Sequence, residues 1–207
     1  MRVLVACEYS GIVRDAFIRA GHDAISCDLL PSESDFGPHI EGDIFKVDMS
    51  GFDLMVAHPP CTYLTNAGAR WLHEETGRWE YMEEGADFFR YFIEAPVPRI
   101  CIENPIMHGH GKSIIGVSQA QTIQPWQFGH GEQKAICLWL KALPPLHPTN
   151  IVEGREQRVH SMAPGPDRQR ERSRFFMGVA DAMAAQWSDI RQGDWVHALE
   201  ASHTSTD

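Results

Sequence analysis

Short apolar runs alternate with helix-length segments along the first half of the chain. Between the runs, apolar residues recur every three or four positions, which predicts helices over residues 12–20 and 74–95. This alternation is typical of a mostly parallel sheet with crossover helices on both faces, so we predict a doubly wound α/β fold. The four runs that we expect to form buried strands are residues 3–6, 23–28, 52–57 and 99–102.

The rest of the chain predicts smaller elements around this sheet. A polar loop at residues 31–41 precedes a short third unit at 42–44. Further along we expect a helix over 114–120, strands at 122–124 and 135–140 that form a hairpin at the sheet edge, and a final helix over 178–187. Residues 1–188 then form one catalytic domain, with a Pro- and Arg-rich loop at 144–174, and 189–207 form a polar tail.

Charge limits the kind of partner that the chain can bind. The 207 residues include 28 Asp and Glu against 18 Lys and Arg, a formal net charge of -10. An acidic surface does not coat nucleic acid through bulk charge, so any contact with it must be local. The apolar start of the chain is too short for a signal peptide, and no run reaches membrane-spanning length. We predict a cytoplasmic protein with no membrane partner.

The cysteines and histidines do not indicate a disulfide framework or a metal site. The five cysteines are odd in number and lack CxxC spacing, which favours reduced thiols. Of the eleven histidines, His108, His110 and His130 invite a metal hypothesis, but no helix-spaced histidine pair or cysteine pair accompanies them. We therefore expect no bound metal.

Reactive side chains follow the predicted strands, where an open parallel sheet binds its ligand. The turn at residues 8–11 would present backbone amides to a carboxylate or phosphate, and Asp28 lies where an acid takes ribose hydroxyls. Its single glycine disfavours a dinucleotide, and a plain strand-to-helix turn with solvated acids remains open. We expect the same edge to carry Asp43, and also Cys61 and Glu103, which follow the fourth and fifth strands.

Cys61 and Glu103 are the strongest candidates for chemistry. Cys61 follows two prolines on a stiff loop, which favours an exposed nucleophile over a buried small apolar side chain. The other four cysteines adjoin apolar runs, so we expect them to be buried. Glu103 ends a strand beside that thiol, where loss of water would raise its pKa and let it donate a proton to a ring nitrogen. An ion pair with Arg99 is the alternative.

The order of these motifs resembles the DNA cytosine-5 methyltransferases, and in detail the short phage-type members that lack a target-recognition domain. The resemblance covers residues 1–105 and continues in 124–146 and 172–187. Its motifs are the turn at 7–11, Asp28, Gly42-Asp43-Ile44, Pro59-Pro60-Cys61 and Glu103-Asn104-Pro105.

This resemblance implies a Rossmann-like methyltransferase fold, S-adenosyl-L-methionine as cofactor and DNA as substrate. The implied cofactor site comprises Cys7, Glu8, Tyr9, Ser10, Gly11, Asp28, Leu29, Asp43, Ile44, His58 and Pro59, with Asp28 at the ribose and Asp43 near the adenine. The implied catalytic residues are Cys61, Glu103, Asn104 and Pro60: the Cys61 thiolate adds to carbon 6 of cytosine while Glu103 holds the ring nitrogen. An aromatic carbon needs covalent activation of this kind before it can attack a sulfonium methyl group. A cytosine within a duplex must also be flipped out of the base stack to reach the site.

Several positions depart from the family pattern. The family's phenylalanine-and-glycine cofactor turn is here Cys7-Glu8-Tyr9-Ser10-Gly11, Thr62 replaces a glutamine, and Pro105 replaces a valine. The recognition lobe is missing, and Lys134 or Gln157-Arg158 could stand in for the arginine motif that precedes it, so sequence-selective recognition is not predicted. The cations that could contact DNA are Lys134, Arg158, Arg168, Arg170, Arg172 and Arg174, although an arginine run is as often simply solvated.

Three other functions remain compatible with the sequence. An amino methyltransferase would place Asp, Asn or Ser where His58 stands and an aromatic residue where Cys61 stands. The same carbon-5 chemistry could act on a free cytidine nucleotide or a short single strand, which suits the acidic surface. A non-catalytic member would bind cofactor or partner without turnover, but the intact Cys61 and Glu103 argue against it.

Overall fold

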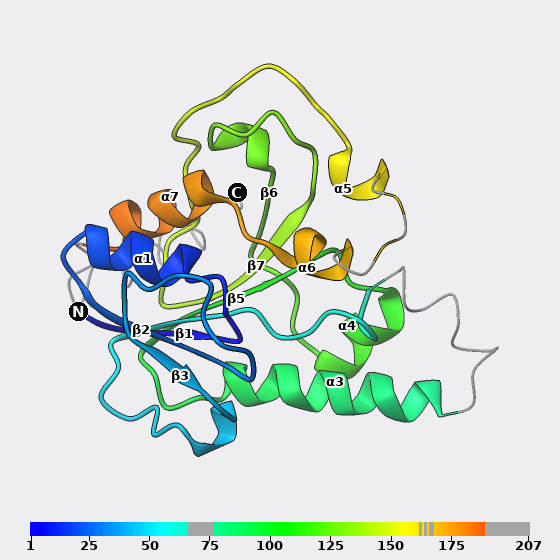
Figure 1. The fold of residues 1–207 in the computed structure, drawn as a ribbon. Helices are drawn as coiled ribbons and strands as arrows, with labels where there is room; N and C mark the ends of the chain where they lie inside the picture. The colour runs from blue at the N-terminus through cyan, green and yellow to red at the C-terminus, as the bar shows by residue number, and fades with distance from the viewer. Residues whose placement is uncertain (66–76, 162, 164, 166–167, 189–207) are drawn as a thin grey trace, which may run out of the picture.

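The computed structural model describes residues 1–65, 77–161, 163, 165 and 168–188 (Figure 1). Within them, one seven-stranded sheet has the order β3-β2-β1-β4-β5-β7-β6. The strands are β1 Arg2–Ala6, β2 Asp23–Asp28, β3 His39–Glu41, β4 Leu54–Ala57, β5 Arg99–Asn104, β6 Gln121–Ile123 and β7 Ile136–Lys141. The helices are α1 Ile12–Arg19, α3 Arg78–Ile93, α4 Gly109–Ile115, α5 Arg158–Ser161, α6 Arg168–Ser173 and α7 Met177–Trp187, with 3-10 turns η1 Ile44–Lys46 and η2 Pro125–Gln127.

The connections of the sheet determine where a ligand can bind. β1 pairs in parallel with β2 and β4, and β4 pairs in parallel with β5. β7 is antiparallel to both β5 and β6. The chain winds outward from β1 to β3 and then returns to the other side of β1, so the winding direction changes between β1 and β4. A crevice opens at such a switch point, beyond the carboxyl ends of the strands.

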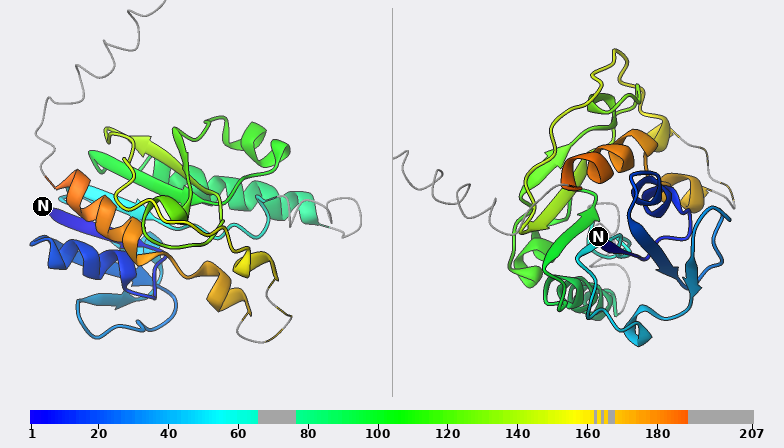
Figure 2. Two further views of the ribbon diagram at one scale, coloured as in Figure 1. Left: turned by 90° about the horizontal axis from the view of Figure 1, so that it is seen from above. Right: turned by 90° about the vertical axis from the view of Figure 1, so that its left-hand side faces the viewer.

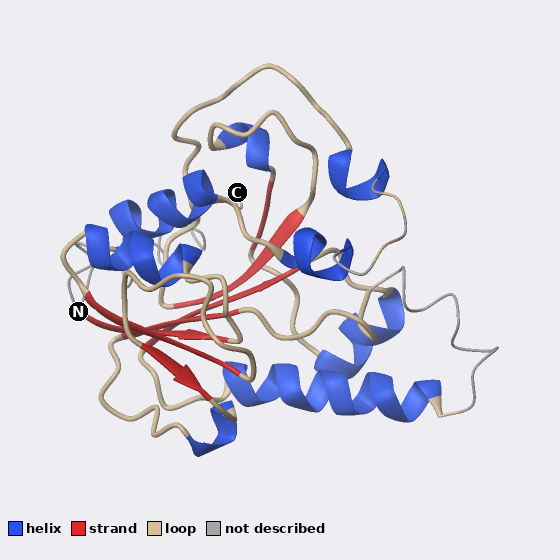
Figure 3. Ribbon diagram, viewed as in Figure 1, coloured by secondary structure: helices blue, strands red, loops and turns tan. Residues whose placement is uncertain are grey.

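Helices cover both faces of the sheet (Figures 2 and 3). Alternate side chains of β1 point to opposite faces: Val3 and Val5 belong to the core under α1 and α7, whereas Leu4 and Ala6 belong to the core under α3. Strands buried on both faces need continuous apolar sequence, which is why β1 and β4 were predictable from sequence. The predicted α/β fold with a mostly parallel sheet is confirmed.

The predicted elements differ from the structure in several places. The predicted loop at 31–41 ends in β3, and residues 42–44 form a turn into η1 instead of a third strand. The helix expected over 114–120 is α4, which ends earlier because Gly116 adopts a left-handed conformation with φ 77°. The 144–174 loop contains α5 and α6, and the predicted tail at 189–207 lies outside the described residues.

No helix in the described part of the chain combines the length and the apolar composition needed to cross a bilayer.

Candidate functional site

The register of the parallel strands brings the predicted site residues to one edge of the sheet. Ala6 lies opposite Cys27 on one side and Ala57 on the other, and Ala57 lies opposite Ile102. The next residue of each chain segment therefore lies at the same level, at the carboxyl end of its strand. These four residues are Cys7, Asp28, His58 and Glu103.

The turn after β1 closes on itself. Gly11 has φ 75°, a conformation that favours glycine, and a side chain there would also meet Arg14 and Ser34. The carboxylate of Glu8 is 5% exposed and accepts hydrogen bonds from the backbone N–H groups of Val13 (2.7 Å) and Arg14 (3.2 Å). The backbone N–H groups of Val13 and Arg14 at the start of α1 are thus satisfied by the chain's own glutamate.

Arg14 fastens the loop between β2 and β3 beside this turn. Its side chain is fully buried and forms an ion pair with Asp15 at 2.7 Å. The guanidinium also donates to the hydroxyl of Ser26 and to the carbonyl oxygen of Ser34. Sequence analysis missed this residue because a charge on the buried side of a helix is identified only by its partners, and those lie on the following strand and loop.

The two acids predicted for the cofactor are held by their own turns. Asp28 Oδ1 accepts the backbone N–H of Leu30 at 3.0 Å, and Asp43 Oδ1 accepts that of Phe45 at 3.0 Å. Both acids act on the thiol of Cys27: burial, then Asp28 and Asp43, raise the pKa of that thiol. Leu29 is largely exposed beside Asp28, whereas Ile44, next to Asp43, is buried. These acids face the edge beyond β2 and β3, where the resemblance places the nucleoside.

Burial also governs the thiol of Cys7 at the start of the turn. Burial raises the pKa of Cys7 far above its ordinary value, and Asp28 and Cys27 add to this effect. The thiolate form of Cys7 is therefore disfavoured beside the turn at residues 8–11.

Two reciprocal hydrogen bonds join the loop after β4 to the end of β5. His58 Nδ1 lies 3.1 Å from Glu103 Oε2. The side-chain amide of Asn104 in turn donates to the carbonyl oxygen of Pro59 at 2.9 Å. Pro60, which follows, is exposed, and together these contacts fix the backbone that carries Cys61 relative to the carboxylate of Glu103.

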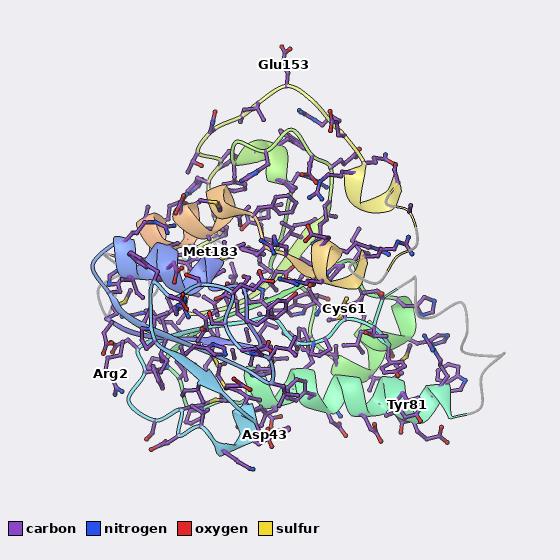
Figure 4. All side chains as sticks on the ribbon, in the orientation of Figure 1. Arg2, Asp43, Cys61, Tyr81, Glu153 and Met183 are labelled. Carbon is purple, nitrogen blue, oxygen red and sulfur yellow. The ribbon has the colours of Figure 1, made fainter. Side chains whose placement is uncertain are left out.

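In the view of Figure 4, Cys61 lies below α6, between Glu153 at the top of the β7–α5 loop and Asp43 near η1. Burial and the charge of Glu103 raise the pKa of the Cys61 thiol, while Lys134 and Arg172 lower it. The thiol is partly exposed and reduced. The thiolate form of Cys61 is therefore disfavoured, first by burial and then by the charge of Glu103.

The pKa of Glu103 moves opposite to the sequence-based expectation. Burial raises it, but the hydrogen bond from His58, the charge of His58 and the charge of Lys134 lower it below its ordinary value of 4.5. The alternative of a pair with Arg99 is wrong, because the partner of Glu103 is His58. The sequence indicated that Glu103 would be buried, but it could not indicate the contact with His58, which lies 45 positions away in the chain.

α6 contains most of the arginine run and packs against the turn at residues 8–11. Arg170 donates to Glu33 Oε1 at 2.6 Å and Arg174 donates to Glu33 Oε2 at 2.7 Å. The backbone N–H of Glu33 donates to the carbonyl oxygen of Tyr9, and the hydroxyl of Tyr9 lies 3.4 Å from that of Ser173. α6 is therefore an intramolecular cover of the turn at residues 8–11.

The other side chains predicted to contact nucleic acid lie in different surroundings from one another. Lys134 Nζ donates to the carbonyl oxygen of Arg172 at 2.9 Å, so two cations adjoin the Cys61 thiol from the α6 side. Arg158 forms an ion pair with Glu132 at 3.0 Å, and Arg168 begins α6. Lys134 and Arg172 are the predicted cations that the structure places next to the predicted nucleophile.

Potential metal ligands do not gather in the part of the chain that the structure describes: no group of three His, Cys, Asp or Glu side chains could hold an ion there. The side chain of His108 caps α4 by accepting the backbone N–H of His110. His130 Nε2 accepts the backbone N–H of Gly178 at 2.9 Å. These two histidines have structural partners.

Comparisons with known proteins find similarity in structure alone. No protein-family model matches the sequence, and no curated protein sequence matches it. A mutant DNMT2 from Spodoptera frugiperda superimposes with a TM-score of 0.41 and 14% identity, covering 79% of this chain and 60% of that one. The Entamoeba histolytica methyltransferase EhMeth gives 0.45 and 12%, covering 80% and 60%. A TehB-like SAM-dependent methyltransferase from Corynebacterium glutamicum gives 0.38 and 17%, covering 68% and 79%.

The chain spans 60% of the length of the first two of these proteins. The chain's own topology is that of a doubly wound α/β sheet: it is mostly parallel, changes direction between β1 and β4, and includes an antiparallel β7.

Proposed function

We propose that this protein is an S-adenosyl-L-methionine-dependent methyltransferase that methylates carbon 5 of cytosine in DNA through a covalent bond to Cys61. The observation that carries the proposal is the pair of hydrogen bonds between the loop of Cys61 and the end of β5. They hold a thiol and a carboxyl group in fixed relation at the switch point of the sheet. Carbon-5 chemistry needs these two groups together.

The residues around the cofactor turn fit the proposed cofactor. Asp28 and Asp43 hold carboxylates beyond β2 and β3, where ribose hydroxyls and an adenine edge would need acceptors. When bound, the cofactor supplies an electrophilic methyl group on a sulfonium. The chain's own contribution is to hold this group beside the carboxyl end of β4.

The proposed reaction assigns one task to each group of the site. The Cys61 thiol gives up its proton to the Glu103 carboxylate, and its sulfur forms a bond to carbon 6 of cytosine. The protonated Glu103 passes this proton to the ring nitrogen, so the electron pair of the 5,6 double bond becomes available at carbon 5. After carbon 5 has taken the methyl group, it gives up its proton to a base, the pair re-forms the double bond, the ring nitrogen returns its proton to Glu103, and the sulfur leaves.

The cations near Cys61 support an anionic substrate. Lys134 and Arg172 lower the pKa of the thiol and would also attract a phosphate brought to it. Arg170 and Arg174 are paired with Glu33, so they offer less charge to a DNA backbone than the sequence alone indicates. This pairing, together with the net charge of -10, favours a short single strand or free cytidine nucleotide as the second candidate substrate.

Parallel assays with labelled cofactor test the proposal. Purified protein is incubated with duplex DNA, single-stranded DNA and free dCMP, and the labelled product is identified by mass spectrometry. We expect 5-methylcytosine in the duplex, and none with Cys61→Ala. Label on an exocyclic nitrogen or on adenine would contradict the carbon-5 assignment, and label on dCMP alone would select the second candidate.

A further inference from the structure

We propose that His58 is a positioning residue for Glu103, which orients the carboxylate toward the base by holding one of its two oxygens. This inference rests on the proposed function, because it concerns how the same carboxyl group meets cytosine. The resemblance assigned His58 to the cofactor site only. The structure places it against the catalytic carboxyl group instead.

The geometry leaves His58 little freedom. Its backbone N–H donates to the carbonyl oxygen of Ala6, which ties the residue to β1. Its ring packs edge to face against Phe175, with centroids 5.0 Å apart. Both His58 and Glu103 have side chains that are 13% exposed. A buried imidazole fixed at its backbone and its ring face sets the position of any group that it binds.

The hydrogen bond uses the carboxylate asymmetrically. The hydrogen bond of His58 Nδ1 is to Oε2 of Glu103. With Glu103 ionised, Nδ1–H is the donor of this bond, and the buried Nε2 has no hydrogen-bond partner among the described residues. One carboxylate oxygen is thus held by His58, and the other is left to meet the base.

The surroundings contain the other groups that act on this pair. Lys134 favours the ionised form of Glu103. Glu103 in turn disfavours the thiolates of the cysteines that face it, which are Cys61, Cys101 and Cys137. The neutral ring of Phe175 completes the enclosure of His58. His58 is therefore the hydrogen-bond donor that the structure gives to Glu103, while Lys134 acts through its charge.

Two variants separate this role from simple packing. His58→Asn keeps an N–H donor near the position of Nδ1 but cannot titrate, whereas His58→Leu keeps the bulk and removes the donor. We expect His58→Leu to lower kcat for methyl transfer about 100-fold, the cost of a misplaced catalytic group. His58→Asn should recover most of this loss, with KM for the cofactor unchanged in both.

A second readout does not depend on turnover. The carboxyl carbon of Glu103 is followed by NMR in glutamate-labelled protein, with Glu103→Gln to assign its signal. Glu103 should titrate at a higher pH in His58→Leu than in the wild type, because burial then acts without the opposing hydrogen bond. The pH profile of kcat should shift in the same direction.

The outcomes distinguish the two proposals. Equal kcat and equal Glu103 titration in wild type and His58→Leu would overturn the role of His58, as would a His58→Asn variant as impaired as His58→Leu. If the wild type methylates no cytosine substrate, the proposed function fails, and the titration of Glu103 still decides whether His58 controls this carboxylate.

Discussion

The imidazole of His58 lies 3.1 Å from the carboxylate of Glu103, although 45 residues separate them in the chain. The contact joins the ends of two adjacent parallel strands, β4 and β5, and its neighbour is the bond from Asn104 to the Pro59 carbonyl oxygen. These two hydrogen bonds hold the loop of Cys61 and the carboxyl group of Glu103 together as one unit. Four of the five predictions below follow from this unit or from the residues that enclose the adjoining turn.

The ionised Glu103 should stabilise the fold only above acidic pH. Because its folded pKa lies below its ordinary value of 4.5, its contribution is present at neutral pH and is lost as the pH falls through the folded pKa. Glu103→Gln should lower the free energy of unfolding at pH 7 by about 1–3 kcal/mol, the range for a buried charged hydrogen bond. Urea unfolding of the wild type and Glu103→Gln at pH 7 and pH 3.5 measures this loss. If the difference in free energy of unfolding between the two proteins is the same at both pH values, the ionised Glu103 does not stabilise the fold.

Alkylation of Cys61 should respond in opposite directions to its neighbours. Glu103 raises the pKa of the thiol and Lys134 and Arg172 lower it. We expect iodoacetamide to label Cys61 faster at pH 8 in Glu103→Gln and slower in Lys134→Gln and Arg172→Gln, as followed by peptide mass spectrometry.

The matched control for this labelling is Cys61→Ala, which reports any reaction at the remaining cysteines. Slower labelling in Glu103→Gln would show that the carboxylate does not face the thiol. Unchanged labelling in both cation variants would remove Lys134 and Arg172 from the surroundings of Cys61.

Arg14 should be essential for the loop that lies beside the cofactor turn. Its guanidinium is fully buried and joins Asp15 to Ser26 and to the backbone of Ser34. Arg14→Met leaves Asp15 without its buried partner, so we expect a loss of about 3–5 kcal/mol in the free energy of unfolding.

Arg19 provides the control on the same helix. It forms an ion pair with Asp181 in which its side chain is 46% exposed, so Arg19→Met should cost about 1 kcal/mol or less. Urea unfolding compares the two variants, and calorimetric titration with the cofactor shows whether the Arg14 variant alone binds it more weakly. Equal effects of the two substitutions would refute the structural role of Arg14.

Glu33 should hold α6 against the cofactor turn. Its two partly exposed ion pairs, with Arg170 and Arg174, contribute together about 1 kcal/mol, which corresponds to a roughly fivefold change in the population of a detached α6. Glu33→Gln should therefore speed tryptic cleavage within residues 168–174 by about that factor. Glu171→Gln removes only a contact of 3.9 Å to Arg174 and should cleave at the wild-type rate; equal rates in all three proteins would show that the pairs do not hold α6.

The parts of the fold that sequence predicts are those that follow local rules. β1 and β4 contain continuous apolar runs, β2 and β5 contain shorter ones, and their order places the reactive residues at one edge. β3 is three residues long with one apolar side chain, and α6 has the sequence RQRERS with no apolar periodicity, so neither gives a local signal.

The site shows the same division. The turn at residues 8–11, Cys61 and Glu103 were identifiable because each follows a predicted strand. The partner of each charge was not, because partners are set by strand register and by loop closure. Glu8 binds the helix that follows it, Glu103 binds His58, and Arg170 and Arg174 bind Glu33, 137 and 141 residues away.

Covalent trapping tests the central claim most directly. DNA that carries 5-fluorocytosine cannot release the enzyme after methyl transfer, because carbon 5 then bears fluorine in place of the proton that must leave. With this DNA and S-adenosyl-L-methionine, the wild-type protein should form a stable complex of the summed mass, joined through Cys61, and Cys61→Ala should form none. The absence of a complex with the wild type, or one that persists in Cys61→Ala, would contradict the proposed mechanism.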